Sequence, residues 1–210
     1  MRTILILVSL AVVPALSLLG QASLTYQNSL GIGKEKYIFM PDPSAPTVAR
    51  YGGSLEDYAT FTKVAGQGFF AELWMSPAKD QPEDTLRPVP GSVVTFRQGT
   101  TAGLIAGKPK LDIQGVQLQD TVTLQLRVWE NFERTVKTWE EAIQMGSIRG
   151  SSPPFNYYFP HPEDFDLPNV TGNIAKGLTY FSLTVPEPSM GSLALIALSG
   201  LVFGRFSRRF

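Results

Sequence analysis

The chain has 210 residues, one histidine and no cysteine, and its 18 basic and 18 acidic side chains cancel. The lack of cysteine excludes a disulfide-stapled scaffold and thiol chemistry. A single histidine, His161, excludes a metal site made from several histidines of one chain. The balanced charge argues against nucleic acid as a partner, and no cofactor is indicated.

The first 22 residues have the layout of a secretory signal peptide. Arg2 supplies a positive start, residues 4–19 are apolar with few interruptions, and residues 20–22 read GQA. These features match the charged, apolar and small-residue regions of such peptides. We therefore expect signal peptidase to cut between Ala22 and Ser23. The alternative is an N-terminal membrane anchor, which the small residues at the end of the run disfavour.

Residues 23–184 form the body, which is long enough for a single domain with its own core. Many short β-branched and aromatic runs, separated by glycine and proline, predict an all-β fold. We expect a two-sheet antiparallel β-sandwich of jelly-roll type with one short helix, lying between an N-terminal signal helix and a C-terminal transmembrane helix. Strands are expected at residues 24–26, 37–39, 58–64, 68–74, 92–96, 121–129, 155–159 and 178–184, with loops at 77–90 and 99–109.

Two strands are marked by alternation. In residues 68–74, Ala71 and Leu73 fall on one face and Glu72 and Trp74 on the other. In residues 121–129, Val122, Leu124, Leu126 and Val128 alternate with Thr121, Thr123, Gln125 and Arg127. The period of two predicts strands with one buried face and one face in water.

One helix is expected in the body. Thr138, followed three residues later by Glu141, makes a capping box. Trp139, Ala142 and Ile143 would form its apolar stripe, and Gly146 would end it.

The acidic loop after His161 holds the only candidate metal ligands. Asp164 and Asp166 supply the hard oxygen atoms that Ca²⁺ prefers. The loop lacks the spacing and glycine of an EF-hand, so a solvated acidic loop is the favoured interpretation.

Catalytic signals are weak. Glu130, Glu133, Glu140 and Glu141 lie near one another in sequence, but nothing places two of them across a cleft, as glycoside hydrolysis requires. His161 has no serine in a nucleophile elbow to serve. We therefore expect no enzyme activity, with a secreted hydrolase as the weakest alternative.

Trp74 and Trp129 are the candidate carbohydrate-binding residues, because both fall on the predicted polar faces of their strands. Exposed, coplanar rings at these positions would suit a carbohydrate-binding module. Packing in a core or under a loop explains aromatic side chains in strands equally well.

The tail, residues 185–210, has three parts in fixed order. Residues 185–189 read VPEPS, residues 190–204 are uncharged and apolar, and residues 205–210 carry Arg205, Arg208 and Arg209. The two prolines keep the first part extended. The second part is long enough for a short membrane helix, with the arginines holding its end on the cytoplasmic side. A buried core helix is the alternative, but the run lacks a polar face.

This order of motif, apolar helix and arginine cluster resembles the PEP-CTERM sorting signal of exopolysaccharide-producing Gram-negative bacteria. The resemblance covers the tail alone. It implies recognition of Pro186, Glu187 and Pro188 by an exosortase, a membrane-embedded peptidase or transpeptidase, and cleavage near them.

Both ends of the chain therefore predict the same topology. Arg2 and the terminal arginines belong inside, so the body lies outside. We expect a precursor anchored in the inner membrane, later placed on the outer surface or released. The body is expected to be a non-catalytic structural or interaction module of the cell surface or matrix. A carbohydrate-binding module that contacts exopolysaccharide is the alternative.

Overall fold

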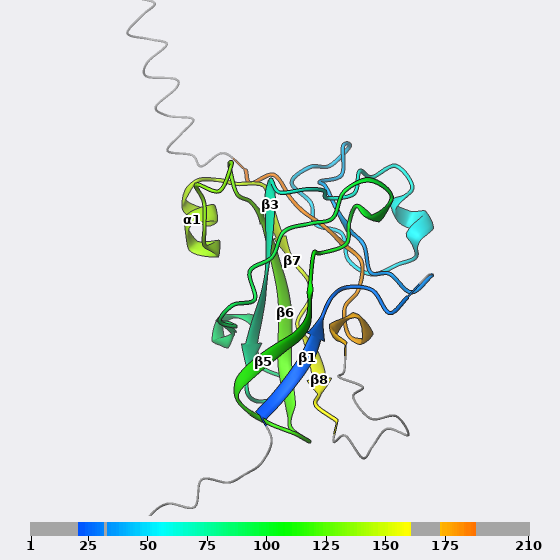
Figure 1. Cartoon of the computed structure of the whole chain (residues 1–210). Coiled ribbons are helices and arrows are strands. Elements are labelled where there is room, and N and C mark those ends of the chain that lie inside the picture. The colour runs from blue at the N-terminus through cyan, green and yellow to red at the C-terminus, as the bar shows by residue number, and fades with distance from the viewer. Residues whose placement is uncertain (1–20, 32, 161–172, 188–210) are drawn as a thin grey trace, which may run out of the picture.

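The computed structural model describes residues 21–31, 33–160 and 173–187, and this part of the chain is mostly β with one short helix (Figure 1). The longer strands are β1 (Gln21–Tyr26), β3 (Phe69–Ser76), β5 (Lys108–Gln117), β6 (Thr121–Glu130) and β8 (Phe155–Tyr158). The shorter strands are β2 (Ile38–Phe39), β4 (Arg87–Pro88), β7 (Arg149–Ser151) and β9 (Phe181–Ser182). The helix is α1 (Trp139–Gln144), and 3₁₀ turns lie at Leu55–Tyr58, Glu83–Thr85, Gly99–Thr101 and Ile174–Lys176.

The strand predicted at residues 121–129 is confirmed as β6, and the structure places it at the centre of the main sheet. It pairs antiparallel with β3 over eight residue pairs, from Phe69 opposite Glu130 to Ser76 opposite Thr123. Its other edge pairs first with β8 and then with β7, and β4 extends the sheet beyond β3. The predicted faces of β3 are confirmed: Ala71 and Leu73 enter the large core, whereas Phe70 packs against Trp129 on the other face.

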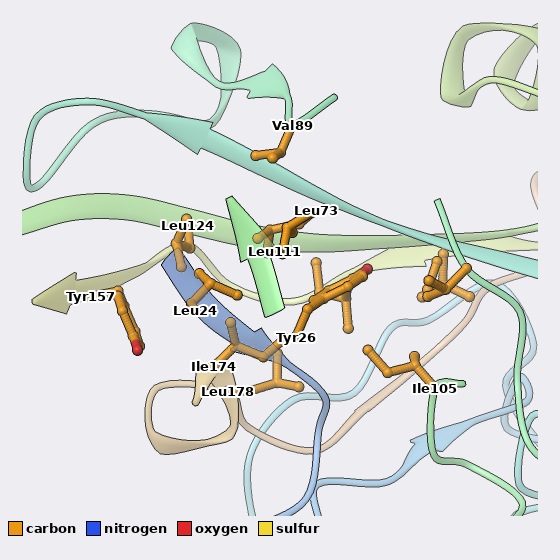
Figure 2. Packing of buried hydrophobic residues seen from close by; sticks show 14 of the residues in the cluster. Leu24, Tyr26, Leu73, Val89, Ile105, Leu111, Leu124, Tyr157, Ile174 and Leu178 are labelled. Atoms are coloured by element: carbon orange, nitrogen blue, oxygen red, sulfur yellow. The ribbon is translucent and has the colours of Figure 1, made fainter. Parts of the chain in front are cut away.

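A two-stranded ribbon of β1 and β5 covers one face of this sheet (Figure 1). Figure 2 shows Leu24 and Tyr26 of β1 and Leu111 of β5 directed toward Leu73 and Leu124. All five side chains are buried. Burial of apolar surface between ribbon and sheet therefore forms the core. Within the described residues, this ribbon has two paired strands, and the sheets do not close on each other.

The prediction of a water-facing side on β6 is wrong. Thr123, Gln125 and Arg127 are all buried. The segment after β3 lies over them, and the N–H of Gln81 donates to Oγ1 of Thr123 at 3.0 Å. Polar side chains can be buried here because each finds a hydrogen-bond partner.

The expected helix is confirmed together with its cap. The side chain of Thr138 accepts from the N–H of Glu141, and Glu141 closes the capping box. Gly146 follows with φ of +65°, the left-handed conformation that ends helices. The apolar stripe is shorter than predicted, because Ala142 is buried but Ile143 is 48% exposed.

Two predicted strands are absent from the described structure, and one observed strand was not predicted. Residues 58–64 form no strand, since the 3₁₀ turn Leu55–Tyr58 and a turn occupy much of this region. Residues 92–96 make only isolated bridges at Val94 and Phe96. β5 was missed, because Gly115, with φ of +74°, interrupts the alternation of its apolar residues.

Candidate functional site

The sorting segment begins where the body ends. The N–H of Leu183 donates to the carbonyl of Phe39 at 2.8 Å, and Thr184 and Arg149 exchange two backbone hydrogen bonds at 2.8 and 3.1 Å. The N–H of Val185 donates to the carbonyl of Pro46 at 2.8 Å. The chain is thus bonded to the body up to the residue before Pro186.

Of the predicted motif, Pro186 is half-buried and Glu187 is exposed at the end of the described chain. Pro188 and the basic cluster of Arg205, Arg208 and Arg209 lie outside the described residues, as does the predicted membrane segment. Among residues 21–31, 33–160 and 173–187, no helix is both long and apolar enough to cross a membrane.

The predicted signal peptidase site lies at the start of β1. Ala22 is fully buried, and Ser23 pairs with Asp112 of β5. Cleavage between Ala22 and Ser23 stays a prediction. It would leave most of β1 on the mature chain.

The ring of Trp74 is covered by an arginine. The guanidinium of Arg127 lies 3.7 Å from the centre of the Trp74 ring, and the indole N–H donates to Glu72 at 2.8 Å. Trp74 is only 5% exposed. An occupied ring face and a bonded indole leave nothing for a sugar to stack on.

Trp129 is fully buried in a second, smaller core. Phe70 and Trp139 contact it edge to face, with ring centres 6.0 and 6.2 Å away. Its indole N–H donates to the carbonyl of Val136 at 3.3 Å. The two predicted carbohydrate-binding tryptophans therefore share one sheet face but present no exposed platform.

Glu72, Gln125 and Arg127 make this covered face polar. Nε of Arg127 donates to Oε1 of Gln125 at 2.8 Å, and Nη2 approaches Oε1 of Glu83 at 3.6 Å. Burial raises the pKa of Glu72, against the hydrogen bond from Trp74 and the charge of Arg127. Burial also lowers the pKa of Arg127. These polar groups bind one another within the protein, so we interpret this sheet face as a structural one.

Of the carboxylates considered for catalysis, Glu141 has a structural role. Glu141 is engaged at the start of α1, where its Oε2 accepts from the N–H groups of Lys137 and Thr138 at 2.6 and 3.2 Å. The calcium candidates Asp164 and Asp166, and also His161, lie outside the described residues. Within the described part of the chain, no group of three or more His, Asp or Glu side chains is arranged to hold a metal ion.

Sequence reasoning missed an aromatic surface cluster. Its rings come from three separate segments and lie 4.5 to 6.4 Å apart between centres: Tyr37, Phe39, Tyr58, Phe61 and Tyr180. Phe39 and Tyr58 are buried, whereas the other three are partly exposed. The aromatic residues are visible in the sequence, but only the fold brings them together.

Three cations lie over the partly exposed rings of this cluster. Lys63 is 3.5 Å from the centre of the Tyr37 ring, Lys36 is 4.9 Å from Tyr180, and Arg50 is 5.3 Å from Phe61. Acidic groups are also near. Asp42 pairs with Arg50, and the charge of Glu35 raises the pKa of Tyr37 after the larger effect of burial.

A hollow of about 270 Å³ lies between the β3–β4 corner and β5. Met75, Pro88 and Val89 line one side, and Ile113 and Gly115 line the other. It is slightly smaller than pockets for small molecules, which measure roughly 300–1,000 Å³. Its lining is largely apolar, and Thr85, Arg87 and Gln114 contribute polar groups to it.

The comparisons with known proteins concern only the tail. A family model described as the PEP-CTERM protein-sorting motif matches residues 184–209. No curated protein and no solved structure matches the chain. The chain therefore carries a PEP-CTERM sorting motif at its C-terminus, which implies an exported, membrane- or surface-associated protein processed by an exosortase. The match begins at Thr184, inside the segment bonded to the body.

Proposed function

We propose that this chain is an exported precursor, anchored in the inner membrane until an exosortase cuts it at the PEP-CTERM signal. The body then acts as a non-catalytic structural or interaction module of the cell surface or extracellular matrix. The observation that carries this proposal is the matched motif at residues 184–209. The exposure of Glu187 at the edge of the body supports it, because a peptidase can reach a carboxylate there without unfolding the domain.

Two variants test the sorting step. Glu187→Ala and Pro186→Ala should accumulate as uncleaved, membrane-anchored protein in a Gram-negative host that carries an exosortase. Folding and export should be unchanged, since neither residue belongs to the core and the signal peptide is intact. Immunoblots of membrane and released fractions measure the outcome.

The matched control is Glu56→Ala, which removes another exposed glutamate far from the motif in sequence. It should be processed like the parent. Parental processing of Glu187→Ala and Pro186→Ala would reduce the tail to a membrane anchor and end the assignment to this sorting pathway.

Export can be tested separately. A reporter that is active only in the periplasm, fused after Val185, should be active in a Gram-negative host, because both chain ends carry arginines that belong inside. An inactive reporter on a cytoplasmic protein would contradict the proposed topology.

The finer fold proposed for the body is a reduced sandwich of jelly-roll type. The packing of the β1–β5 ribbon on the five-stranded sheet supports it. The proposal of a non-catalytic body is supported by the use of Glu141 as a helix cap.

A second candidate function is binding of an acidic exopolysaccharide. It is favoured by the aromatic surface cluster, where Lys36 and Lys63 lie over partly exposed tyrosine rings. Ring faces suit sugar rings, and ammonium groups suit their carboxylates. Trp74 and Trp129 play no part in this candidate, because both are buried.

The test uses a polyuronate as the probe. The parent should bind it at low salt and lose it as salt rises, because exposed charges are screened. The Lys36→Ala/Lys63→Ala double variant should lose binding, whereas the control pair Lys79→Ala/Lys137→Ala should retain it. Equal binding by both double variants would count against the cluster as the site.

A further inference from the structure

We propose that the folded body sets the upstream limit of processing, so that the cut falls on the C-terminal side of Val185 and the processed protein keeps this residue. This inference rests on the proposed processing by an exosortase and adds the position of the modification. It follows from how residues 182–185, here called the terminal clamp, are held.

Both backbone edges of the terminal clamp are occupied. On one side, β9 runs parallel to β2, and the N–H of Leu183 donates to the carbonyl of Phe39. On the other side, Thr184 exchanges two hydrogen bonds with Arg149 of β7. Peptidases commonly bind substrates as extended strands through backbone hydrogen bonds. No edge of the clamp is free for such pairing.

The first and last residues of the terminal clamp are also hydrogen-bonded to the body. The N–H of Ser182 donates to the carbonyl of Arg50 at 3.1 Å, and its hydroxyl accepts from the N–H of Arg50 at 3.1 Å. At the other end, Val185 donates to Pro46 at 2.8 Å. Each of the four amides therefore donates to a backbone carbonyl of the body.

Side-chain burial reinforces these bonds. Ser182 and Leu183 are fully buried, and Gly150 of β7 lies directly against Leu183. Peeling the clamp away would expose Leu183 to water and break the backbone bonds on both edges, both of which are unfavourable.

Backbone N–H donation to the body stops at Pro186. Proline has no N–H to donate, and Glu187 is exposed. Pro186 is therefore the first residue after the terminal clamp that donates no backbone hydrogen bond to the body, and the exposed Glu187 follows it at the end of the described chain.

The first experiment locates the cut. The full chain is expressed in a host that carries an exosortase, and the C-terminal residue of the processed protein is determined by mass spectrometry. We expect every product to end at Val185 or beyond. A product that ends at Thr184 or earlier overturns this inference alone. A chain that stays unprocessed overturns the proposed function, and this inference falls with it.

The second experiment tests whether the body holds the clamp. Hydrogen exchange of the full chain in detergent should show the amides of residues 182–185 protected about 100-fold or more relative to Glu187. Leu183→Ala should raise exchange in the clamp. The control Leu126→Ala removes an equally buried leucine from β6. In this variant, amide exchange in the clamp should rise no more than amide exchange in the rest of the body. Equal loss of clamp protection in both variants, or unprotected amides in the parent, overturns the inference.

A milder pair covers the case in which Leu183→Ala fails to fold. A Cβ added at Gly150 would lie 3.1 Å from Cα of Leu183, whereas one added at Gly68 would meet nothing within 4 Å. Gly150→Ala should therefore speed exchange in residues 182–185 and Gly68→Ala should not. Identical exchange in the two alanine variants would show that β7 does not hold the clamp.

Discussion

Arg127 provides the sharpest test of the covered sheet face. Its side chain is almost fully enclosed, stacked 3.7 Å from the Trp74 ring and bonded to Gln125 at 2.8 Å. Replacing it with alanine removes the stack, removes the donor to a buried amide oxygen and leaves a cavity. A surface arginine would have none of these contacts. The loss of unfolding free energy on substitution therefore distinguishes a buried Arg127 from an exposed one.

The expected cost of Arg127→Ala can be built from its contacts. A desolvated cation–π contact stabilises by about 2 kcal/mol, and a hydrogen bond from a charged group by about 1.5–3 kcal/mol. The exposed partner Glu83 adds little, since screened ion pairs give roughly 0–1 kcal/mol. We expect a loss of about 3.5–5 kcal/mol, close to the roughly 3–5 kcal/mol typical when a buried charge pair is broken.

Thermal unfolding followed by tryptophan fluorescence measures this loss. Trp74 and Trp139 lie beside Arg127, so their emission reports on this face directly. For a body of this size, the expected loss lowers the Tm by roughly 7–20 °C. Arg127→Lys should also destabilise, because lysine cannot reproduce the planar stack and fork.

The control is Arg97→Ala, at an exposed position, which should change stability by less than about 0.5 kcal/mol. If Arg127→Ala costs no more than this control, the guanidinium is in water. The described cover over β6 would then be wrong.

Three further predictions concern single positions in the body. Tyr26→Phe should retain stability or gain about 1 kcal/mol in urea unfolding, because the buried Tyr26 hydroxyl has no hydrogen-bond partner among the described residues; a loss above about 1 kcal/mol would reveal an unseen partner. The folded-state pKa of Glu72 lies above its usual value of 4.5, so the folded state holds the extra proton and stability should fall as the pH rises through the window just above 4.5. Glu72→Gln should flatten that fall relative to the exposed-site variant Glu56→Gln, and an unchanged pH profile would argue against a buried carboxylate. Gly107→Ala should destabilise by about 2 kcal/mol or more, because its Cβ would collide with the Tyr26 carbonyl. Gly68→Ala has open space and is the comparison; equal stability of the two alanine variants would contradict the packing of β1 on this loop.

Local signals in the sequence were sufficient for several features. The alternation of residues 121–129 identified a strand, and the pair Thr138 and Glu141 identified the helix with its cap. These features depend on neighbours within a few residues, so a pattern in the chain records them directly. The sorting motif is local in the same sense, and its match at residues 184–209 agrees with the three-part tail.

The polarity of β6 was misread for a physical reason. Thr123, Gln125 and Arg127 look like a water-facing row, and alternation cannot distinguish water from a polar cover. Only the tertiary structure brings the segment around Gln81 and Glu83 over this row and supplies partners for its side chains. The same cover explains why Trp74 is enclosed although it lies on the polar face.

The sequence by itself therefore determined the sorting motif of this protein and the mostly β character of its body. The tertiary structure decided where the body stops, because residues 182–185 are bonded to Phe39, Pro46, Arg50 and Arg149, which lie far from them along the chain. Such pairings depend on the closure of long loops, and no local pattern encodes which distant carbonyl an amide will reach. Pro186 is visible in the sequence as a rigid residue, but only the fold shows that it stands at the boundary between bonded and accessible chain.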